Sequence, residues 1–427
     1  MEEQNEVRES GQIQYVGTGR GGNGSNKRSG FLPGVLVGIL VAVIAVGIYF
    51  ALTGGSGQIA VQSSGADSAV NKESINKLSV LEQYLDRYYY KSSEITKEDK
   101  ENGLYKGLFE SLGDVYSCYY TPEEYKILAE QTKGVYYGIG AYVSQDVETG
   151  ICAISGVIKN SPAEAAGLME GDLIYKVNGE DMSGLDLDEV VSHIRGEEGT
   201  EVTLTLVRNG EEIEVSLKRA KVDTPTVESE MLDDGIGYLQ ITEFDDVTVG
   251  QFNENLNALK GQGMKGLIID LRGNPGGSVT SVCSVADQLL PDGLIFYMED
   301  RDGNRTEYNC EGVDFGLPLV VLVNEYSASA AEILSGAIKD SGIGKLVGKK
   351  TFGKGIVQDV IPLQDGSAFK LTIANYYTRG GNDIHLKGID PDIEVDLDAD
   401  AYLEDGTDTQ LDKAVEVILE EMGSTGN

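Results

Sequence analysis

The chain has 427 residues, 41% of them hydrophobic, which is enough for two or three domains with separate cores. Its 34 basic and 70 acidic residues give a net charge of −36, and this negative field would repel a phosphate backbone, so nucleic acid is not an expected partner. The four cysteines show no CxxC spacing and only two histidines are present, so we expect neither a metal site nor a cofactor. Whether Cys283 pairs with Cys310 outside the cell is left open.

A membrane anchor is predicted near the N-terminus. The segment 31–52 is apolar and uncharged, and as a helix it would span roughly 30 Å of hydrocarbon. Arg20, Lys27 and Arg28 precede it and the next basic residue is Lys72, so the positive-inside rule places the N-terminus in the cytoplasm. A cleaved signal peptide is the alternative, but the apolar stretch is long for the hydrophobic region of a signal peptide and lacks a small-x-small cleavage site. We therefore expect a single-pass protein of the cell membrane, with the residues from Thr53 onward outside the cytoplasm.

The segments around this anchor differ in composition. Residues 1–30 are rich in Gly, Ser and Asn and are predicted to be a disordered cytoplasmic tail, and residues 53–71 have linker composition. Residues 72–133 show helical apolar spacing, and Pro122 and Glu123 are typical first-turn residues of a second helix. The apolar stripes of this helical region fit packing within the chain or a homodimer equally well.

Residues 134–222 change to short alternating strands, with an Asn-Gly hairpin signal in "RNGEE". The stretch "SPAEAAGLMEGDLIYKVNGEDM" resembles a PDZ domain, and "YYGIGAYV" resembles its loop for a peptide carboxylate. A glycine-rich loop can offer N–H groups to a chain-terminal carboxylate, while a sheet edge pairs with the tail. Arg195 is a candidate for relaying tail binding, against the alternative of a plain surface charge. The resemblance therefore implies a substrate-binding loop of Tyr137, Gly138, Ile139 and Gly140.

Residues 223–396 alternate apolar strands with helical patterns, which indicates an α/β core. Residues 397–427 end in a helix and tail, with Leu411, Val415, Ile418 and Met422 on one helix face for packing. The predicted fold class is therefore a multidomain α/β (α+β) protein.

Within this core, "SASAAEI" has two interpretations. Ser329 and Glu332 have the spacing of a capping box, in which two side chains satisfy backbone N–H groups at a helix start. Ser329 could instead be a nucleophile. The loop in "LIIDLRGNPGGS" also has two interpretations. It is either an ordinary strand-to-helix turn or a set of N–H groups that bind an oxyanion.

The stretch "GKKTFGKG" nearly spells a phosphate-binding loop, but Gly355 replaces the required Ser or Thr and strand-like residues follow. If Lys354 begins a strand, Gln358 lies on the same strand face and could orient the lysine amine. A lysine in an apolar pocket has a lowered pKa and can act as a general base for a serine. A solvated surface lysine is the alternative. We interpret His193 and His385 as structural, because neither has a nucleophile-elbow motif to serve.

Together "NEYSASAAEILSGAIKD", "VGKKTFGKGIVQ", "LIIDLRGNPGGS" and "KGIDPD" resemble the carboxy-terminal processing peptidases, which are PDZ-containing serine endopeptidases. With the PDZ stretch, the resemblance covers roughly residues 75–396. It implies a core of the ClpP/crotonase-like type. It also implies Ser329 as nucleophile, Lys354 as general base, Gln358 as the residue that orients the lysine, and the amides of Gly277 and Ala330 as the oxyanion hole.

We therefore expect a membrane-anchored extracytoplasmic Ser–Lys endopeptidase that cleaves protein substrates near or from their C-termini. Its partners would be proteins with accessible apolar tails, captured by the PDZ domain, and the membrane itself through residues 31–52. The alternative is a non-proteolytic scaffold that binds C-terminal tails through the same domain.

Overall fold

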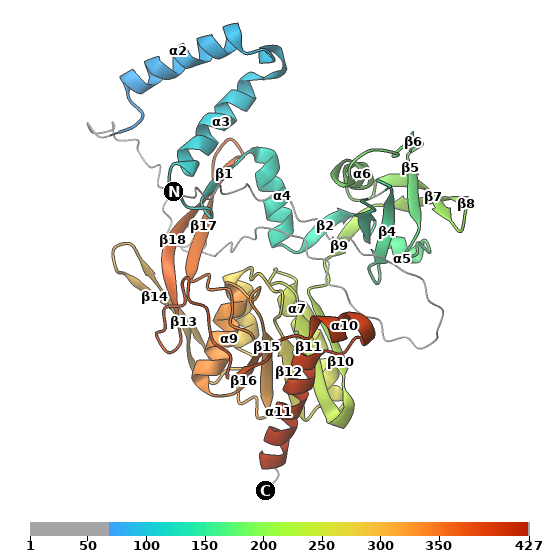
Figure 1. Ribbon diagram of the computed structural model, residues 1–427, viewed down its shortest axis with the longest axis vertical. Helices are drawn as coiled ribbons and strands as arrows, with labels where there is room; N and C mark the ends of the chain where they lie inside the picture. Colours follow the sequence, from blue (N-terminus) through green and yellow to red (C-terminus); the bar gives the residue numbers. More distant parts are fainter. Residues whose placement is uncertain (1–67, 148, 426–427) are drawn as a thin grey trace, which may run out of the picture.

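The computed structural model describes residues 68–147 and 149–425, so the predicted anchor at 31–52 lies outside the described residues. Among the residues it describes, no helix combines the length and apolarity needed to cross a bilayer. Figure 1 shows three parts: a helical region at the top, a β-rich domain at its side, and an α/β core below.

The helical region contains a short strand that the sequence analysis did not predict. The predicted start of its second amphipathic segment is confirmed: Pro122 is the first residue of that helix, and Thr121 and Glu124 cap it reciprocally, at 3.2 and 2.8 Å. The added strand β1 pairs antiparallel with a long strand of the core, β18, and so ties the helical region into a core sheet. The elements are α2 (Lys72–Tyr88), α3 (Lys97–Glu110), β1 (Cys118–Tyr120), α4 (Pro122–Thr132) and β18 (Ala368–Thr378).

The β-rich domain is a six-stranded sheet with a separate two-stranded ribbon of β2 and β9. Its predicted hairpin is confirmed: Asn209 and Gly210 have φ of 53° and 83°, the positive values that a two-residue turn of this type requires. Strand β3 stands at one end of the sheet order, with helix α6 against it. The elements are β2 (Val135–Gly138), β3 (Ala141–Gln145), β4 (Cys152–Val157), α5 (Pro162–Ala165), β5 (Leu173–Val177), β6 (Glu180–Asp181), α6 (Leu187–Ile194), β7 (Glu201–Arg208), β8 (Glu211–Lys218) and β9 (Ala220–Asp223).

The core is built on a second six-stranded sheet in the order β10-β11-β12-β15-β16-β19, parallel except for β10. Side chains alternate along its strands: Ile269 faces the cluster with α7, α8 and α9, and Ile268 faces the cluster with α11. This sheet is therefore covered on both faces. Its elements are β10 (Val227–Met231), β11 (Ile236–Ile241), α7 (Thr248–Gly261), β12 (Gly266–Asp270), α8 (Val279–Ala286), β15 (Leu319–Val323), α9 (Ala330–Ser341), β16 (Lys345–Gly348) and β19 (Ile393–Glu394).

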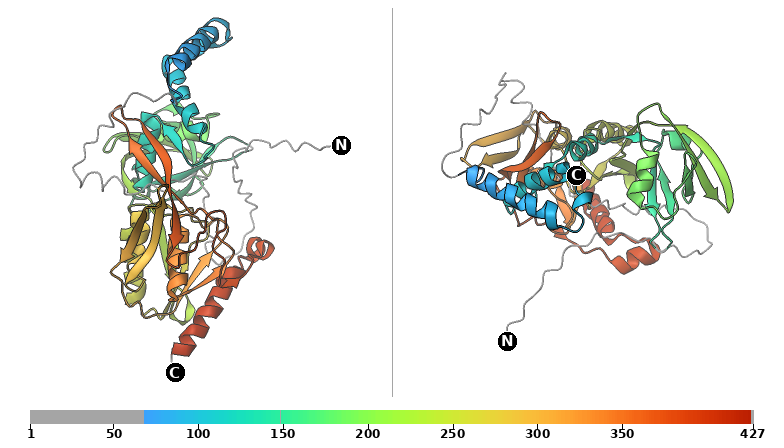
Figure 2. Two further views of the ribbon diagram at one scale, coloured as in Figure 1. Left: turned by 90° about the vertical axis from the view of Figure 1, so that its left-hand side faces the viewer. Right: turned by 90° about the horizontal axis from the view of Figure 1, so that it is seen from above.

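The last helix covers the outer face of the parallel sheet, as Figure 2 shows. Its predicted apolar face is confirmed, because Ile418 is fully buried and Leu411, Val415 and Met422 pack in the same cluster. A partly buried arginine, Arg272, bonds Asp270 at 2.6 Å and Asp408 at 2.8 Å, which ties the start of this helix to strand β12. The elements are α10 (Ala399–Asp405) and α11 (Thr409–Thr425).

A further sheet lies against α9 on the side of the helical region, and β18 is its central strand. One edge of β18 pairs with β17 along most of its length. The other edge pairs with β1 over residues 368–370 and with β13 over 374–378, which leaves residues 371–373 between the two partners. The remaining elements are β13 (Gly293–Asp300), β14 (Arg305–Cys310) and β17 (Ile356–Pro362).

Candidate active site

Ser329 occupies a strained turn at the start of helix α9. Its φ of 54° and ψ of −114° lie in a region that side-chain-bearing residues rarely adopt, at a cost of roughly 1–3 kcal/mol. The surroundings hold this conformation: the Tyr376 hydroxyl donates to the Ser329 carbonyl at 3.0 Å, and both residues are buried. Strained backbone of this kind is found preferentially at functional sites.

Glu332 has a larger role than the predicted cap. Its carboxylate accepts the Ser329 N–H at 3.0 Å, which is the expected half of the capping box. The amide of Glu332 lies 2.9 Å from the Ser329 carbonyl, so the serine hydroxyl is not needed to cap it. The same carboxylate also accepts the N–H groups of Gly353 at 2.7 Å and Lys354 at 2.8 Å, and the Thr351 hydroxyl at 2.5 Å.

Glu332 is fully buried, and burial raises the pKa of its carboxyl group while these four hydrogen bonds oppose the rise. Three of the four partners are backbone N–H groups, which can only donate, so the arrangement suits the ionised form. One oxygen, Oε2, is shared by the amides of Ser329 and Lys354. The carboxylate therefore joins the helix that carries the serine to the loop that carries the lysine.

Lys354 is buried and only 6% exposed. Burial, and after it the nearby positive charge of Lys370, lowers the pKa of Lys354 to about 8, while the carboxylates of Glu332 and Asp114 act in the opposite direction. The amine lies 4.8 Å from the centroid of the Tyr116 ring, which belongs to the helical region. A lysine in this state can release or accept a proton near neutral pH.

Gln358 is buried on strand β17, four residues after Lys354. Its Nε2 donates to the Thr372 hydroxyl on β18 at 3.3 Å. The strand begins at Ile356 and has a register shift between Val357 and Gln358, so it is less regular than the single strand face in the sequence analysis. That Gln358 orients the lysine stays a prediction.

The glycine loop packs directly on the serine turn. A Cβ added to Gly276 would lie 2.7 Å from Ser329 Cβ and 2.9 Å from the amide of Ala330, and one on Gly277 would lie 2.3 Å from the Phe244 carbonyl. In the described part of the chain, neither Gly277 nor Ala330 donates its amide to a backbone carbonyl. That these two amides form the oxyanion hole stays a prediction.

The predicted tail-binding loop lies in the β-rich domain, separate from the serine and lysine. Tyr137 is partly exposed and Gly138 ends β2, whereas Ile139 is a core residue whose carbonyl accepts the Ala163 amide at 2.7 Å. The Gly140 carbonyl accepts the Ile158 amide at 3.0 Å. The guanidinium of the predicted relay residue, Arg195 at the end of α6, stacks 5.6 Å from the centroid of the Tyr136 ring on β2.

The other sequence candidates fall outside this chemistry. His193 lies on α6 of the β-rich domain, with Nδ1 2.8 Å from the Glu189 carbonyl. The backbone of His385 packs against Gly355, next to the lysine loop, and its Nδ1 is buried without a hydrogen-bond partner among the described residues. A strand follows "GKKTFGKG", as expected when the phosphate-loop interpretation is rejected. Cys283 and Cys310 are free thiols.

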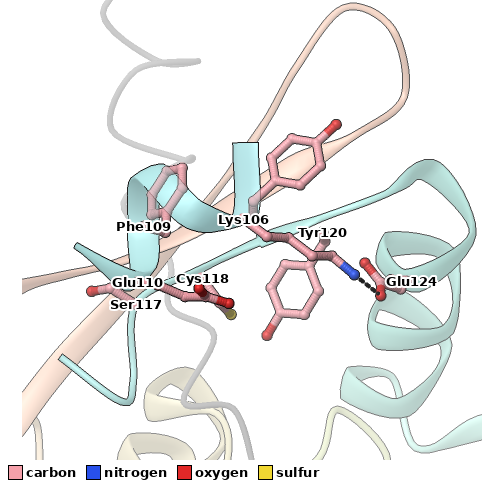
Figure 3. Close-up of a pocket in the computed structure, with 8 residues that line it drawn as sticks. Lys106, Phe109, Glu110, Ser117, Cys118, Tyr120 and Glu124 are labelled. Atoms are coloured by element: carbon pink, nitrogen blue, oxygen red, sulfur yellow. Dashed lines mark hydrogen bonds and ion pairs between the residues drawn. The ribbon is translucent and has the colours of Figure 1, made fainter. Parts of the chain in front are cut away.

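Two groups near the lysine were missed by the sequence analysis: the Glu332 clamp and the segment 113–117 of the helical region. The second adjoins a cavity of about 340 Å³ between α3, β1 and α4. Figure 3 shows the Lys106 amine pointing at Glu124, an ion pair of 2.7 Å, on the wall of this cavity. The lining residues are Lys106, Phe109, Glu110, Ser117, Cys118, Tyr119, Tyr120 and Glu124.

Comparison with known proteins identifies the family of this chain. Residues 235–395 match peptidase family S41, and residues 154–208 match the PDZ domain. The carboxy-terminal processing protease CtpA of Bacillus subtilis (strain 168) is 37% identical over 399 residues, which cover 90% of this chain and 84% of the relative. A CtpA-like serine protease of Staphylococcus aureus (strain COL), named there as probable, is 34% identical over 85% of this chain and 72% of its own length.

Among solved structures, a candidate S41 protease of Bacteroides fragilis NCTC 9343 has a similar fold, with a TM-score of 0.50, 19% identity, and coverage of 80% of this chain and 97% of that one. The photosystem II D1 C-terminal processing protease matches at 30% identity over 74% of this chain and 86% of that one, with a TM-score of 0.44. The chain therefore belongs to peptidase family S41 and is a PDZ-containing serine protease of the carboxy-terminal processing type.

Proposed function

We propose that this protease works by a Ser–Lys mechanism, with Ser329 as nucleophile and Lys354 as general base. The observation that carries the proposal is the shared Glu332 oxygen, which bonds the amides of both residues at 3.0 and 2.8 Å. A buried carboxylate bonded in this way holds the two backbone segments next to each other. The lowered lysine pKa of about 8 supports the assignment, because a base must be neutral to take a proton.

The mechanism follows from these positions. Lys354 Nζ takes the proton of Ser329 Oγ as the oxygen attacks the scissile carbonyl carbon. The amides of Gly277 and Ala330 would hold the oxyanion that forms, and the lysine then returns its proton to the leaving amine. The resulting acyl-enzyme is hydrolysed by a water that the neutral lysine activates in the same way. The N-terminal end of helix α9, which begins at Ala330, adds a favourable dipole for the negative charge.

Substrate selection is assigned to the PDZ domain. Strand β3 is at the end of its sheet order and packs against α6, so an extended peptide tail can add as a further strand at its edge, beside that helix. The loop of Tyr137, Gly138, Ile139 and Gly140 would receive the tail carboxylate. Arg195 lies beside this loop, against Tyr136 of β2, which supports a role in relaying tail binding to gate the active site.

We further propose that residues 31–52 anchor the protein in the cell membrane, with the protease outside the cytoplasm. This proposal rests on the apolar composition of that segment and on the basic residues before it. The expected substrates are extracytoplasmic proteins with accessible apolar C-terminal tails, and no metal or cofactor is needed for the steps above.

The test is cleavage of an unstructured protein with an apolar C-terminus by the purified full-length chain in detergent. Ser329→Ala and Lys354→Ala should each reduce kcat by several orders of magnitude, because each removes a reacting group. Thermal melts should show that both variants stay folded. Wild-type rates in either variant would refute the assignment.

A further inference from the structure

The segment 113–117 reaches from the helical region to the proposed base. It connects helix α3 to strand β1 and carries Asp114, Tyr116 and Ser117. The Tyr116 ring lies 4.8 Å from the amine of Lys354. The Asp114 carboxylate accepts three hydrogen bonds: from the Tyr116 amide at 3.0 Å, from the Ser117 hydroxyl at 2.6 Å, and from the Thr372 hydroxyl of the core at 2.6 Å.

Thr372 joins this segment to Gln358. It lies in the part of β18 that neither β1 nor β13 pairs, and its amide donates instead to the Ser117 hydroxyl at 3.0 Å. Its own hydroxyl accepts from Gln358 Nε2 at 3.3 Å and donates to Asp114 at 2.6 Å. One chain of hydrogen bonds therefore runs from Asp114 through Thr372 to Gln358.

The direction of this chain follows from the donors that are present. An ionised carboxylate can only accept, so the one hydroxyl hydrogen of Thr372 goes to Asp114. Burial raises the pKa of the Asp114 carboxyl, but its hydrogen bonds and the nearby positive charge of Lys370 outweigh this effect and hold the pKa below its usual value, so the group is ionised at neutral pH. The Thr372 oxygen must then accept from Gln358, which turns the amide nitrogen toward Thr372 and leaves Gln358 Oε1 as an acceptor on the other side.

We propose that Asp114 is a positioning residue for the reaction, acting through Thr372 to set which way the Gln358 amide faces. Only with Oε1 turned away from Thr372 can Gln358 accept a hydrogen bond from a lysine amine and aim its lone pair at the serine. The Tyr116 ring covers that amine from the same segment. The inference rests on the proposed Ser–Lys roles, and it makes the helical region a part of the active site.

The role can be tested with two threonines of strand β18. Thr372 and Thr378 each donate a hydroxyl to an aspartate, Asp114 and Asp340, but Thr372 alone accepts from Gln358. In the full-length chain, Thr372→Val should lower kcat roughly 10- to 100-fold with KM within about two-fold, because the base is misaimed while the substrate site is intact. The matched control Thr378→Val should keep kcat, and Thr372→Ser, which restores the hydroxyl, should recover it.

Asp114→Asn gives a second readout that a purely structural role would not move. Its amide can donate to Thr372, which frees the threonine hydrogen to turn toward Gln358 and flip that amide. The charged and titratable groups that act on Lys354 are Lys370, Glu332 and Asp114, with Tyr116 over the amine. Removing the Asp114 charge takes away a group that raises the pKa of Lys354, so the acidic limb of the kcat/KM profile should move to lower pH while kcat falls.

The outcomes separate this inference from the Ser–Lys assignment. Full activity of Ser329→Ala in the same assay would overturn the assignment itself. An inactive Ser329→Ala, together with equal kcat for Thr372→Val and Thr378→Val, would overturn only the role of Asp114. Wild-type kcat in Asp114→Asn would do the same. Thermal melts and Thr372→Ser exclude unfolding as the cause of a lost rate.

Discussion

Replacing Glu332 by Gln would test whether one carboxylate holds the two halves of the active site together. The substitution keeps the shape of the side chain, but it removes the charge and turns one acceptor oxygen into a donor. If the amide nitrogen replaces Oε2, it faces the amides of both Ser329 and Lys354. If the amide nitrogen replaces Oε1, it faces the amide of Gly353, while the Thr351 hydroxyl can turn and accept a hydrogen bond from it. At least one buried N–H group loses its partner in either case.

The cost can be worked from these contacts. A hydrogen bond to a charged group is worth about 1.5–3 kcal/mol, and charge-assisted bonds are roughly twice as strong as neutral ones. One such bond lost and the others weakened give about 3 kcal/mol, since Glu332 is fully buried. For a domain of this size that corresponds to a fall in Tm of roughly 6–12 °C. Misplacing the serine and lysine backbones should also lower kcat about 100-fold.

The assay is a thermal melt together with steady-state cleavage of an unstructured substrate. Asp340→Asn is the matched control, because it makes the same acid-to-amide change near the far end of helix α9, where Asp340 accepts the Gly380 amide at 2.6 Å. We expect Asp340→Asn to keep kcat. Wild-type kcat in Glu332→Gln, or an equal loss in Asp340→Asn, would refute the view that Glu332 aligns the two reacting groups.

Three further predictions concern the base, the glycine loop and the PDZ hairpin. The kcat/KM of the wild type should rise with pH through about 8, where buried Lys354 becomes neutral. Lys370→Met should move this rise to higher pH, because the substitution removes a positive charge near Lys354. A flat pH profile of the wild type would argue against a lysine base. Gly276 has a φ of 109°, and the Cβ of Gly276→Ala would lie 2.7 Å from Ser329 Cβ. This substitution should lower kcat about 100-fold by displacing the proposed oxyanion site. An unchanged kcat would mean that the loop does not shape this site. Gly210→Ala, at φ 83° in the hairpin turn, should destabilise the PDZ domain by about 1 kcal/mol in a melt without lowering kcat on a substrate that lacks a binding tail.

Much of the fold follows from local pattern. The helix caps at Thr121 and Ser329, the Asn209-Gly210 turn and the apolar face of α11 were all predictable, because each depends on residues within one or two helical turns or on a single tight turn. The α/β class was predictable for the same reason, since buried strands and amphipathic helices alternate along the core.

The candidate site was only partly predictable. The motifs around Ser329, Lys354 and Gln358 carry a family resemblance, so these residues could be named without coordinates. Glu332 was interpreted as a cap alone, because nothing local shows that it also bonds the amides of Gly353 and Lys354. Asp114 gave no signal, because its bond to Thr372 joins positions 258 residues apart.

By itself, then, the sequence determined most of the elements, the family and the identity of the residues that are proposed to react, because periodicity, caps, turns and motifs are encoded locally. Only the tertiary structure decided how those residues are held. It added strand β1 to a core sheet, buried Lys354 beneath the Tyr116 ring, and placed one carboxylate between Ser329 and Lys354. The physical reason is that desolvation and hydrogen bonds between distant segments depend on which surfaces come into contact in the fold. The spacing of residues along the sequence does not show which surfaces these are.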